Sequence, residues 1–246
     1  MNGGHLLSNE IVKYNNIMNE VSFRKFNPVE FDLFFSLCSK MKLKGSEPIT
    51  LTFDEVKKLT NYSSRDKVRF IHDLENMYSK MLNLNFRYED ETEIVRFVLF
   101  PIYRINKEKN TVTIGVNQEF SYVLNEITTN FTRFELEGFT ELRSGYAKTM
   151  FRLLKQYKST GFYIVKIDEF RRILDIPESY RVTDIDKRVL QQIEKELSPL
   201  YTKFEIIKKK KKGRGRGGIV SHLEFNFMEK VPPEKQKVPL HNWLEQ

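Results

Sequence analysis

The chain has 246 residues, of which 40% are hydrophobic and 13% aromatic, so it can bury a core, and global disorder is excluded. Its formal net charge is +8, but seven positive charges lie in residues 208–218, which contain no acid, so the rest of the chain is close to +1. Charge concentrated in one segment indicates a local contact with an anionic partner such as nucleic acid and argues against a generally basic surface.

The sequence lacks the motifs of common enzyme classes. It has no GxxxxGK[ST] phosphate loop and no cysteine pair, and its histidines share no metal-ligand spacing: His5, His72, His222 and His241. It also lacks two histidines around one apolar residue, the pattern of nicking initiators of rolling-circle replication. We therefore expect no enzymatic activity, no metal and no cofactor.

Two further features predict a cytoplasmic protein without membrane contact. The N-terminus has no signal-peptide pattern, and no stretch approaches the roughly 18 apolar residues of a membrane span. The single cysteine, Cys38, lies in an apolar run and is expected to be buried as a small hydrophobic residue in a reducing compartment.

The first half predicts the elements of a winged helix. Residues 8–21 carry apolar side chains at helical spacing. Asn27, Pro28 and Glu30 form a capping-box pattern that begins a second helix. The elements expected after it are a strand at 47–53, a helix-turn-helix over 53–81, and two hairpins within 82–100 and 103–117. Helix, helix-turn-helix and hairpin in this order describe a winged helix.

The second half repeats the order. Ser144 is predicted to cap a helix, and the elements that follow are a strand at 162–166, helices at 167–176 and 183–200, and two strands within 203–227. FDEVKKL at 53–59 and IDEFRRI at 167–173 share one pattern of apolar, acidic and basic residues. We therefore predict an α+β fold of two tandem winged helices related by duplication, at 8–125 and 135–227, with a tail at 228–246.

The basic segment lies between two strand patterns. Apolar residues alternate before it (Phe204, Ile206) and after it (Leu223, Phe225, Phe227), which predicts a hairpin whose turn the glycines supply. Adjacent lysines repel one another, and phosphates would relieve that repulsion. We expect the segment to be a DNA-gripping wing; the alternative is a solvated basic loop. The cations assigned to the wing are Lys208, Lys209, Lys210, Lys211, Lys212, Arg214 and Arg216.

The helix before the wing is the predicted recognition helix, at 183–197. Ile185, Val189, Ile193 and Leu197 fall on one arc, and Lys187, Arg188, Gln191 and Lys195 on the opposite side. Arginine can bond guanine and glutamine can bond adenine, so Arg188 and Gln191 are assigned to bases. Lys187, Arg181 and Lys195 are assigned to phosphates or bases. The alternative is a plain solvated face, over which the adjacent wing favours recognition.

Three more cations are counted as candidate DNA contacts. Arg65 and Arg69 lie on the exposed side predicted for the helix at 64–81, where nearby acids dilute the charge and a protein interface or plain exposure is an equal alternative. Lys148 lies on the helix that Ser144 begins.

The second half resembles a known family. LRSGYAKTMFRLLKQYKSTG, IDEFRRILDI, YRVTDIDKRVLQQIEKEL and KKGRGRGGIVSHLEFNF, in that order, resemble the second winged helix of iteron-binding, theta-type plasmid replication initiators, and residues 8–125 resemble the first. The resemblance implies binding of origin repeats as a monomer, opening of adjacent AT-rich DNA, and recruitment of the host initiator and replicative helicase. It also implies autorepression as a dimer through an inverted repeat, with the first module supplying the dimer interface. The basic run is longer than the family's wings, and residues 228–246 match nothing in the family.

Two other functions remain open from the sequence. A dimeric transcriptional repressor would use the same fold but an inverted repeat instead of direct repeats. A nicking relaxase would cut supercoiled origin DNA and become attached to it through a tyrosine.

Overall fold

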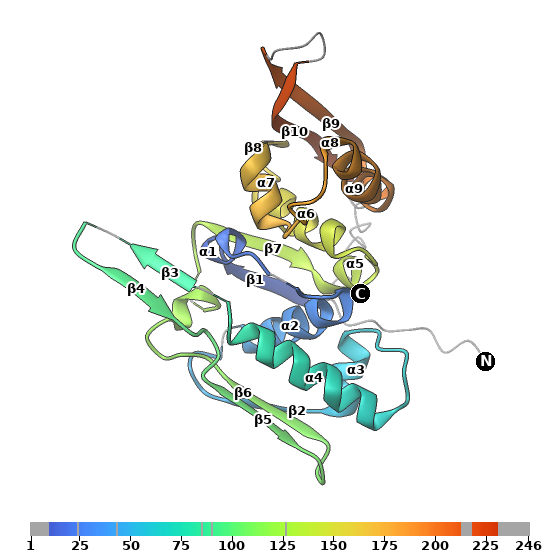
Figure 1. Ribbon diagram of the computed structural model, residues 1–246. Coiled ribbons are helices and arrows are strands. Elements are labelled where there is room, and N and C mark those ends of the chain that lie inside the picture. The colour runs from blue at the N-terminus through green and yellow to red at the C-terminus, as the bar shows by residue number, and fades with distance from the viewer. Residues whose placement is uncertain are drawn as a thin grey trace, which may run out of the picture.

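The computed structural model describes residues 10–230 except residues 24, 43, 85, 90, 126 and 213–217. It contains two winged helices, one above the other in Figure 1. The first elements of the chain are β1 (Ile11–Asn15), α1 (Ile17–Glu20), α2 (Pro28–Met41), β2 (Ile49–Thr52), α3 (Phe53–Leu59), α4 (Lys67–Met81), β3 (Phe86–Glu89), β4 (Ile94–Phe97), β5 (Ile102–Asn106), β6 (Thr111–Gly115), η1 (Ser121–Val123), β7 (Phe131–Glu135) and α5 (Leu136–Thr140). The elements that follow are α6 (Gly145–Gln156), β8 (Phe162–Lys166), α7 (Ile167–Ile173), α8 (Val182–Ile185), η2 (Asp186–Leu190), α9 (Gln191–Leu197), η3 (Ser198–Leu200), β9 (Tyr201–Lys211) and β10 (Ile219–Glu229).

The two modules share one topology. Their three-stranded sheets have the orders β2-β6-β5 and β8-β10-β9, so in each the strand before the helix-turn-helix pairs with the last strand of the hairpin. The turn after the first helix of each pair is also the same, because Asn61 and Asp175 both adopt positive φ angles, 49° and 52°. Tyr62 N donates to Lys57 O and Ile176 N to Arg171 O at matching positions. The predicted α+β architecture of two related winged helices is confirmed.

Local sequence signals placed most elements correctly. Asn27 Oδ1 accepts from Glu30 N at 3.0 Å, and Glu30 Oε2 accepts from Asn27 N at 2.7 Å, which is the predicted capping box at the start of α2. Ser144 Oγ caps α6 by accepting from Ala147 N. Cys38 is fully buried, as expected.

The prediction of a helix at 8–21 is wrong for most of these residues. Residues 8 and 9 lie outside the described residues, and Ile11–Asn15 form strand β1, which pairs antiparallel with β7. Val12 and Tyr14, two residues apart, are both buried, as in a strand that buries one face. The apolar residues of 8–21 also fit helical spacing, so the sequence alone suits either element. The distant partner strand decides between the two, and only the short α1 remains helical.

An aromatic core joins the modules. Phe35 of α2 packs against Phe134 of β7 and Phe139 of α5, and Phe151 of α6 contacts the same two rings. Helix α6 packs on α2 and β7 and also on α9 of the second module. Glu196 of α9 accepts from the backbone N–H groups of Arg143 and Ser144, at 2.8 and 3.1 Å. The recognition helix is therefore fixed against the body of the protein.

The DNA-binding role expected of Lys148 is wrong. Its side chain is fully buried, and its Nζ donates to Asp32 Oδ1 at 2.6 Å and to Phe139 O at 2.7 Å. The ammonium also lies over the Phe139 ring. Burial raises the pKa of Asp32 to about 7 despite this neighbour, and burial lowers the pKa of Lys148. Lys148 therefore holds α6 to α2 and cannot reach a phosphate.

Candidate nucleic-acid interface

The recognition helix buries one stripe and exposes the opposite side. Ile185, Val189, Ile193 and Leu197 are almost fully buried. The four candidate DNA contacts at 187, 188, 191 and 195 are exposed: Lys187, Arg188, Gln191 and Lys195. The structure brings these four together on the solvent side of one helix, as the sequence predicts.

This helix is not a regular α-helix. The middle turn, η2, is a π turn in which Gln191 N donates to Asp186 O, five residues back. Residues four apart drift by about 40° per step around an α-helix, so a stripe with strict four-residue spacing would wind off the core. A π turn contains about one residue more than an α-helical turn, and this extra residue rotates the apolar stripe back to the core side. The spacing of Ile185, Val189, Ile193 and Leu197 is the sequence signal for this turn, and it was missed.

Arg188 is held from two sides. Its guanidinium carbon lies 5.2 Å from the centre of the Tyr180 ring, and its Nη1 lies 3.5 Å from Tyr180 Oη. Its Nε is 4.0 Å from Asp184 Oδ1, one turn back on the helix. The aromatic ring beside the planar guanidinium restricts its orientation on the exposed side of the helix. No pattern in the sequence pointed to Tyr180 or Asp184 in this role.

Arg181 lies just before α8 and is exposed. Its backbone N–H donates to Asp184 Oδ2 at 3.0 Å, so Asp184 caps the helix start and also faces Arg188. The Arg181 side chain is left at the N-terminal end of the recognition helix, where a phosphate would also meet the positive end of the helix dipole.

Residues 208–211 of the basic segment lie in a paired hairpin, as predicted. Strands β9 and β10 are antiparallel, and Lys208, Lys210 and Lys211 lie opposite Leu223, Val220 and Ile219. Gly218 closes the described part of the turn at φ +64°, where a Cβ would lie 3.0 Å from Lys211 O, so glycine suits this position. Arg214 and Arg216 lie outside the described residues.

The lysines alternate between the two faces of the wing. Lys208 and Lys210 share the face of the buried Leu223 and Val220, which is the face toward the core. Lys209 and Lys211 lie opposite His222 and Ile219 on the other face. A run of five lysines therefore places cations on both sides of the ribbon.

The wing and the recognition helix lie side by side. Lys208 Nζ is 2.7 Å from Asp186 Oδ2 in the π turn, and α9 packs on β9 (Figure 1). On the other face, Lys209 Nζ is 2.9 Å from Glu224 Oε2. Lys210, Lys211 and Lys212 are exposed, and no acid of the described residues forms an ion pair with them. One duplex could thus contact the exposed side of the helix and the wing together.

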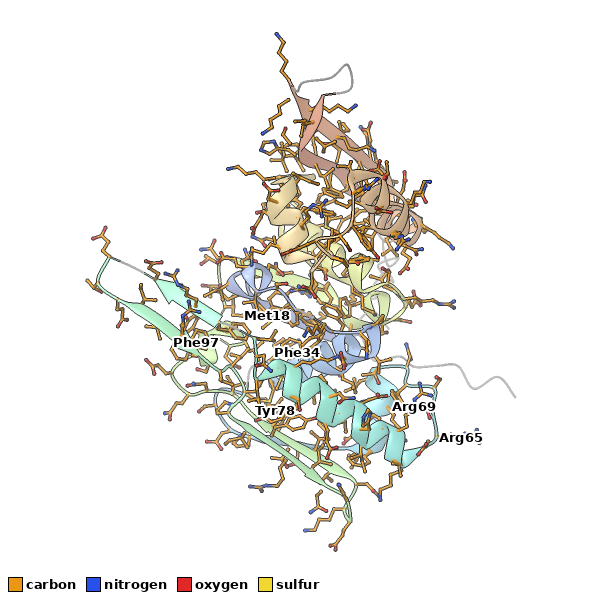
Figure 2. The ribbon with its side chains drawn as sticks, viewed as in Figure 1. Met18, Phe34, Arg65, Arg69, Tyr78 and Phe97 are labelled. Carbon is orange, nitrogen blue, oxygen red and sulfur yellow. The ribbon has the colours of Figure 1, made fainter. Side chains whose placement is uncertain are left out.

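Arg65 and Arg69 are not part of this surface. Both are exposed at the N-terminal end of α4 in the first module, well apart from α8 and α9 (Figure 2). Asp66 caps α4 between them by accepting from Val68 N and Arg69 N. Any DNA contact by these two arginines would be separate from that of the helix and the wing.

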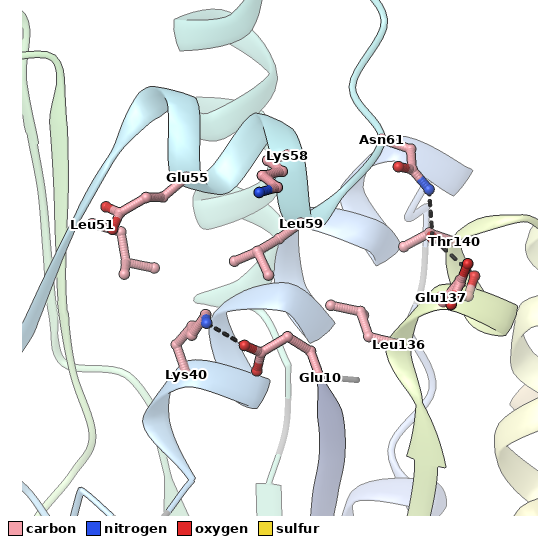
Figure 3. A pocket seen from close by; sticks show the side chains of 10 residues that line it. All are labelled: Glu10, Lys40, Leu51, Glu55, Lys58, Leu59, Asn61, Leu136, Glu137 and Thr140. Atoms are coloured by element: carbon pink, nitrogen blue, oxygen red, sulfur yellow. Dashed lines mark hydrogen bonds and ion pairs between the residues drawn. The ribbon is translucent and has the colours of Figure 1, made fainter. Parts of the chain in front are cut away.

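The first module also has an open hollow of about 320 Å³ (Figure 3). Leu51, Leu59 and Leu136 supply apolar lining, and an ion pair between Lys40 and Glu10 lies at its edge. None of the predicted DNA contacts lines it. Among the described residues, no cluster of histidine, cysteine and acidic side chains could hold a metal, and no helix is both long and apolar enough to cross a bilayer.

Comparison with known proteins assigns both modules. Residues 11–155 match the model of the first winged-helix domain of initiator replication proteins, and residues 166–227 match the model of the second winged-helix domain of initiator Rep proteins. The chain belongs to the Rep initiator family. The first match extends through α6 almost to its end.

Two relatives agree with this family. The initiator is 33% identical over 236 residues to a probable replication protein rep of Bifidobacterium longum (strain NCC 2705), over 92% of this chain and 75% of that protein. Its structure is similar to that of the Pi initiator protein crystallised in complex with iteron DNA, with a TM-score of 0.70 and 11% sequence identity, over 91% of this chain and 99% of that one. The structural match shows that the two proteins share a fold.

Proposed function

We propose that this initiator binds iteron repeats at a plasmid origin through the helix at 183–197 and the wing. Each iteron takes one chain, with Arg188 and Gln191 at base edges and with Lys187, Arg181, Lys195 and cations of the wing at phosphates or bases. The observation that carries this proposal is the contact between Lys208 and Asp186, because it places the wing and the helix at one surface.

The first module has a supporting role in this proposal. It provides the interface of a homodimer, in equilibrium with the monomer, that represses the initiator's own gene through an inverted repeat. Arg65 and Arg69 provide auxiliary phosphate contacts. The monomer bound at the origin helps to open AT-rich DNA and recruits the host initiator and the replicative helicase in the cytoplasm. The predicted domain limits of 8–125 and 135–227 are part of this proposal.

Footprinting tests the proposed function. Purified protein is titrated onto the DNA that flanks its own gene in the plasmid, and the stoichiometry of each complex is measured by native mass spectrometry. We expect protected direct repeats about two helical turns apart, each occupied by one chain. A single inverted repeat occupied only by a dimer would instead identify a transcriptional repressor.

A further inference from the structure

Asp186 is an acidic residue of the recognition helix that lies next to two of its exposed cations. Asp186 directly precedes Lys187 and Arg188, where a carboxylate would repel an approaching phosphate. Its Oδ2 accepts from Lys208 Nζ at 2.7 Å. Its Oδ1 is buried without a hydrogen-bond partner among the described residues, so Lys208 is the group that compensates this carboxylate.

The geometry turns Asp186 toward the wing and not toward solvent. Asp186 is the first residue of the π turn, and its neighbour Ile185 is buried against the core. Lys208 lies on the core-facing side of β9, opposite Leu223. The ion pair therefore joins the start of the π turn of the recognition helix to the base of the wing.

We infer that Asp186 is a positioning residue that sets the wing against the recognition helix, and that Lys208 is its anchor and not a phosphate ligand. This inference rests on the proposed DNA-binding function. The pair fixes the distance between the base-reading side chains and the wing lysines at 210–212, so a duplex must satisfy both at once. Lys209 is also paired, with Glu224, so within the described part of the wing the phosphate-binding cations are then Lys210, Lys211 and Lys212.

Salt dependence separates an anchored lysine from a phosphate-binding one. Each cation that binds a phosphate releases counterions and adds about 0.9 to the slope of log K against log salt on duplex DNA. A lysine that stays paired with Asp186 releases none. Lys210 is the matched control, because it lies two residues along the same face and has no ion-pair partner among the described residues.

The experiment measures fluorescence anisotropy at several KCl concentrations. The probes are a random-sequence 30-bp duplex and a duplex that the wild-type protein selects from a random library. The variants are Lys208→Met, Lys210→Met and Asp186→Asn, and circular dichroism confirms that each is folded.

We expect Lys208→Met to keep the wild-type slope on random DNA, and Lys210→Met to lower it by about 0.9. Asp186→Asn frees Lys208, so the slope on random DNA should rise by about 0.9 and binding to it should tighten. The preference of Asp186→Asn for the selected duplex should fall by about two- to fivefold, as for loss of a partly exposed ion pair. Asp186→Glu should retain most of that preference.

An equal loss of slope in Lys208→Met and Lys210→Met would overturn the inference, because Lys208 would then bind phosphate. Unchanged preference and slope in Asp186→Asn would overturn the role of Asp186. If the wild-type protein selects no duplex over random DNA, the proposed function itself fails, which is a distinguishable result.

Discussion

Replacing Asp32 with alanine is expected to lower the free energy of unfolding by about 3–5 kcal/mol at pH 8. The change leaves the Lys148 ammonium fully buried without its carboxylate partner. An uncompensated buried charge costs far more than the loss of an exposed ion pair. Urea denaturation followed by circular dichroism measures the effect.

The control is the double variant Asp32→Leu with Lys148→Met. Because it removes both charges and keeps a similar apolar volume, it should be close to neutral or stabilising. If the single variant costs less than about 1 kcal/mol, the range for exposed pairs, Lys148 is not charged and buried as described.

The buried pair of Asp32 and Lys148 also predicts that the stability of the protein depends on pH. The pKa of Asp32 is about 7 in the folded protein and about 4 when the chain is unfolded. Between these values the folded state holds a proton that the unfolded chain has released, so the contribution of Asp32 to stability falls as the pH rises from about 4 to 7. Asp32→Asn should remove this component of the pH dependence.

Replacing Arg188 with alanine is expected to weaken binding to the selected duplex by about 1–3 kcal/mol and to relax preference at particular base pairs. Tyr180 and Asp184 hold the guanidinium on the exposed side of the helix, so its loss removes a preorganised contact. Binding to random DNA should fall much less. Selection from a random library with each protein measures the preference at every position.

Lys203→Ala is the matched control for charge. Lys203 is exposed on the outer face of the second module's sheet, opposite Met228, and its loss also removes one positive charge. It should leave the selected sequence unchanged. Equal losses on selected and random DNA for Arg188→Ala would reject its base-reading role.

The parts of the fold that the sequence predicted are those that depend on interactions between residues close together in the chain. The Asn27–Glu30 capping box and the alternation around the basic run depend on neighbouring residues, so they could be read directly. Strand β1 could not, because its apolar spacing suits both a helix and a strand and the distant β7 decides. The π turn does not follow from helical periodicity, because that pattern assumes a uniform α-helical rotation per residue.

The sequence predicted which residues of the candidate site are exposed, but it did not predict the contacts that these residues make within the protein. Lys187, Arg188, Gln191 and Lys195 follow from helical periodicity alone. Whether a cation faces DNA or a partner within the protein depends on tertiary packing. Packing buries Lys148 against Asp32 and pairs Lys208 with Asp186, so charge alone overestimated the number of free cations.

Tethered cleavage of DNA tests most directly whether the helix and the wing meet one duplex. Cys38 is buried, so Gln191→Cys and Lys210→Cys can each carry a hydroxyl-radical-generating label at one accessible site. We predict that both labels cut the selected duplex, at positions within about one helical turn of each other. Cleavage from position 191 without cleavage from position 210, or cleavage at unrelated positions, would contradict the account.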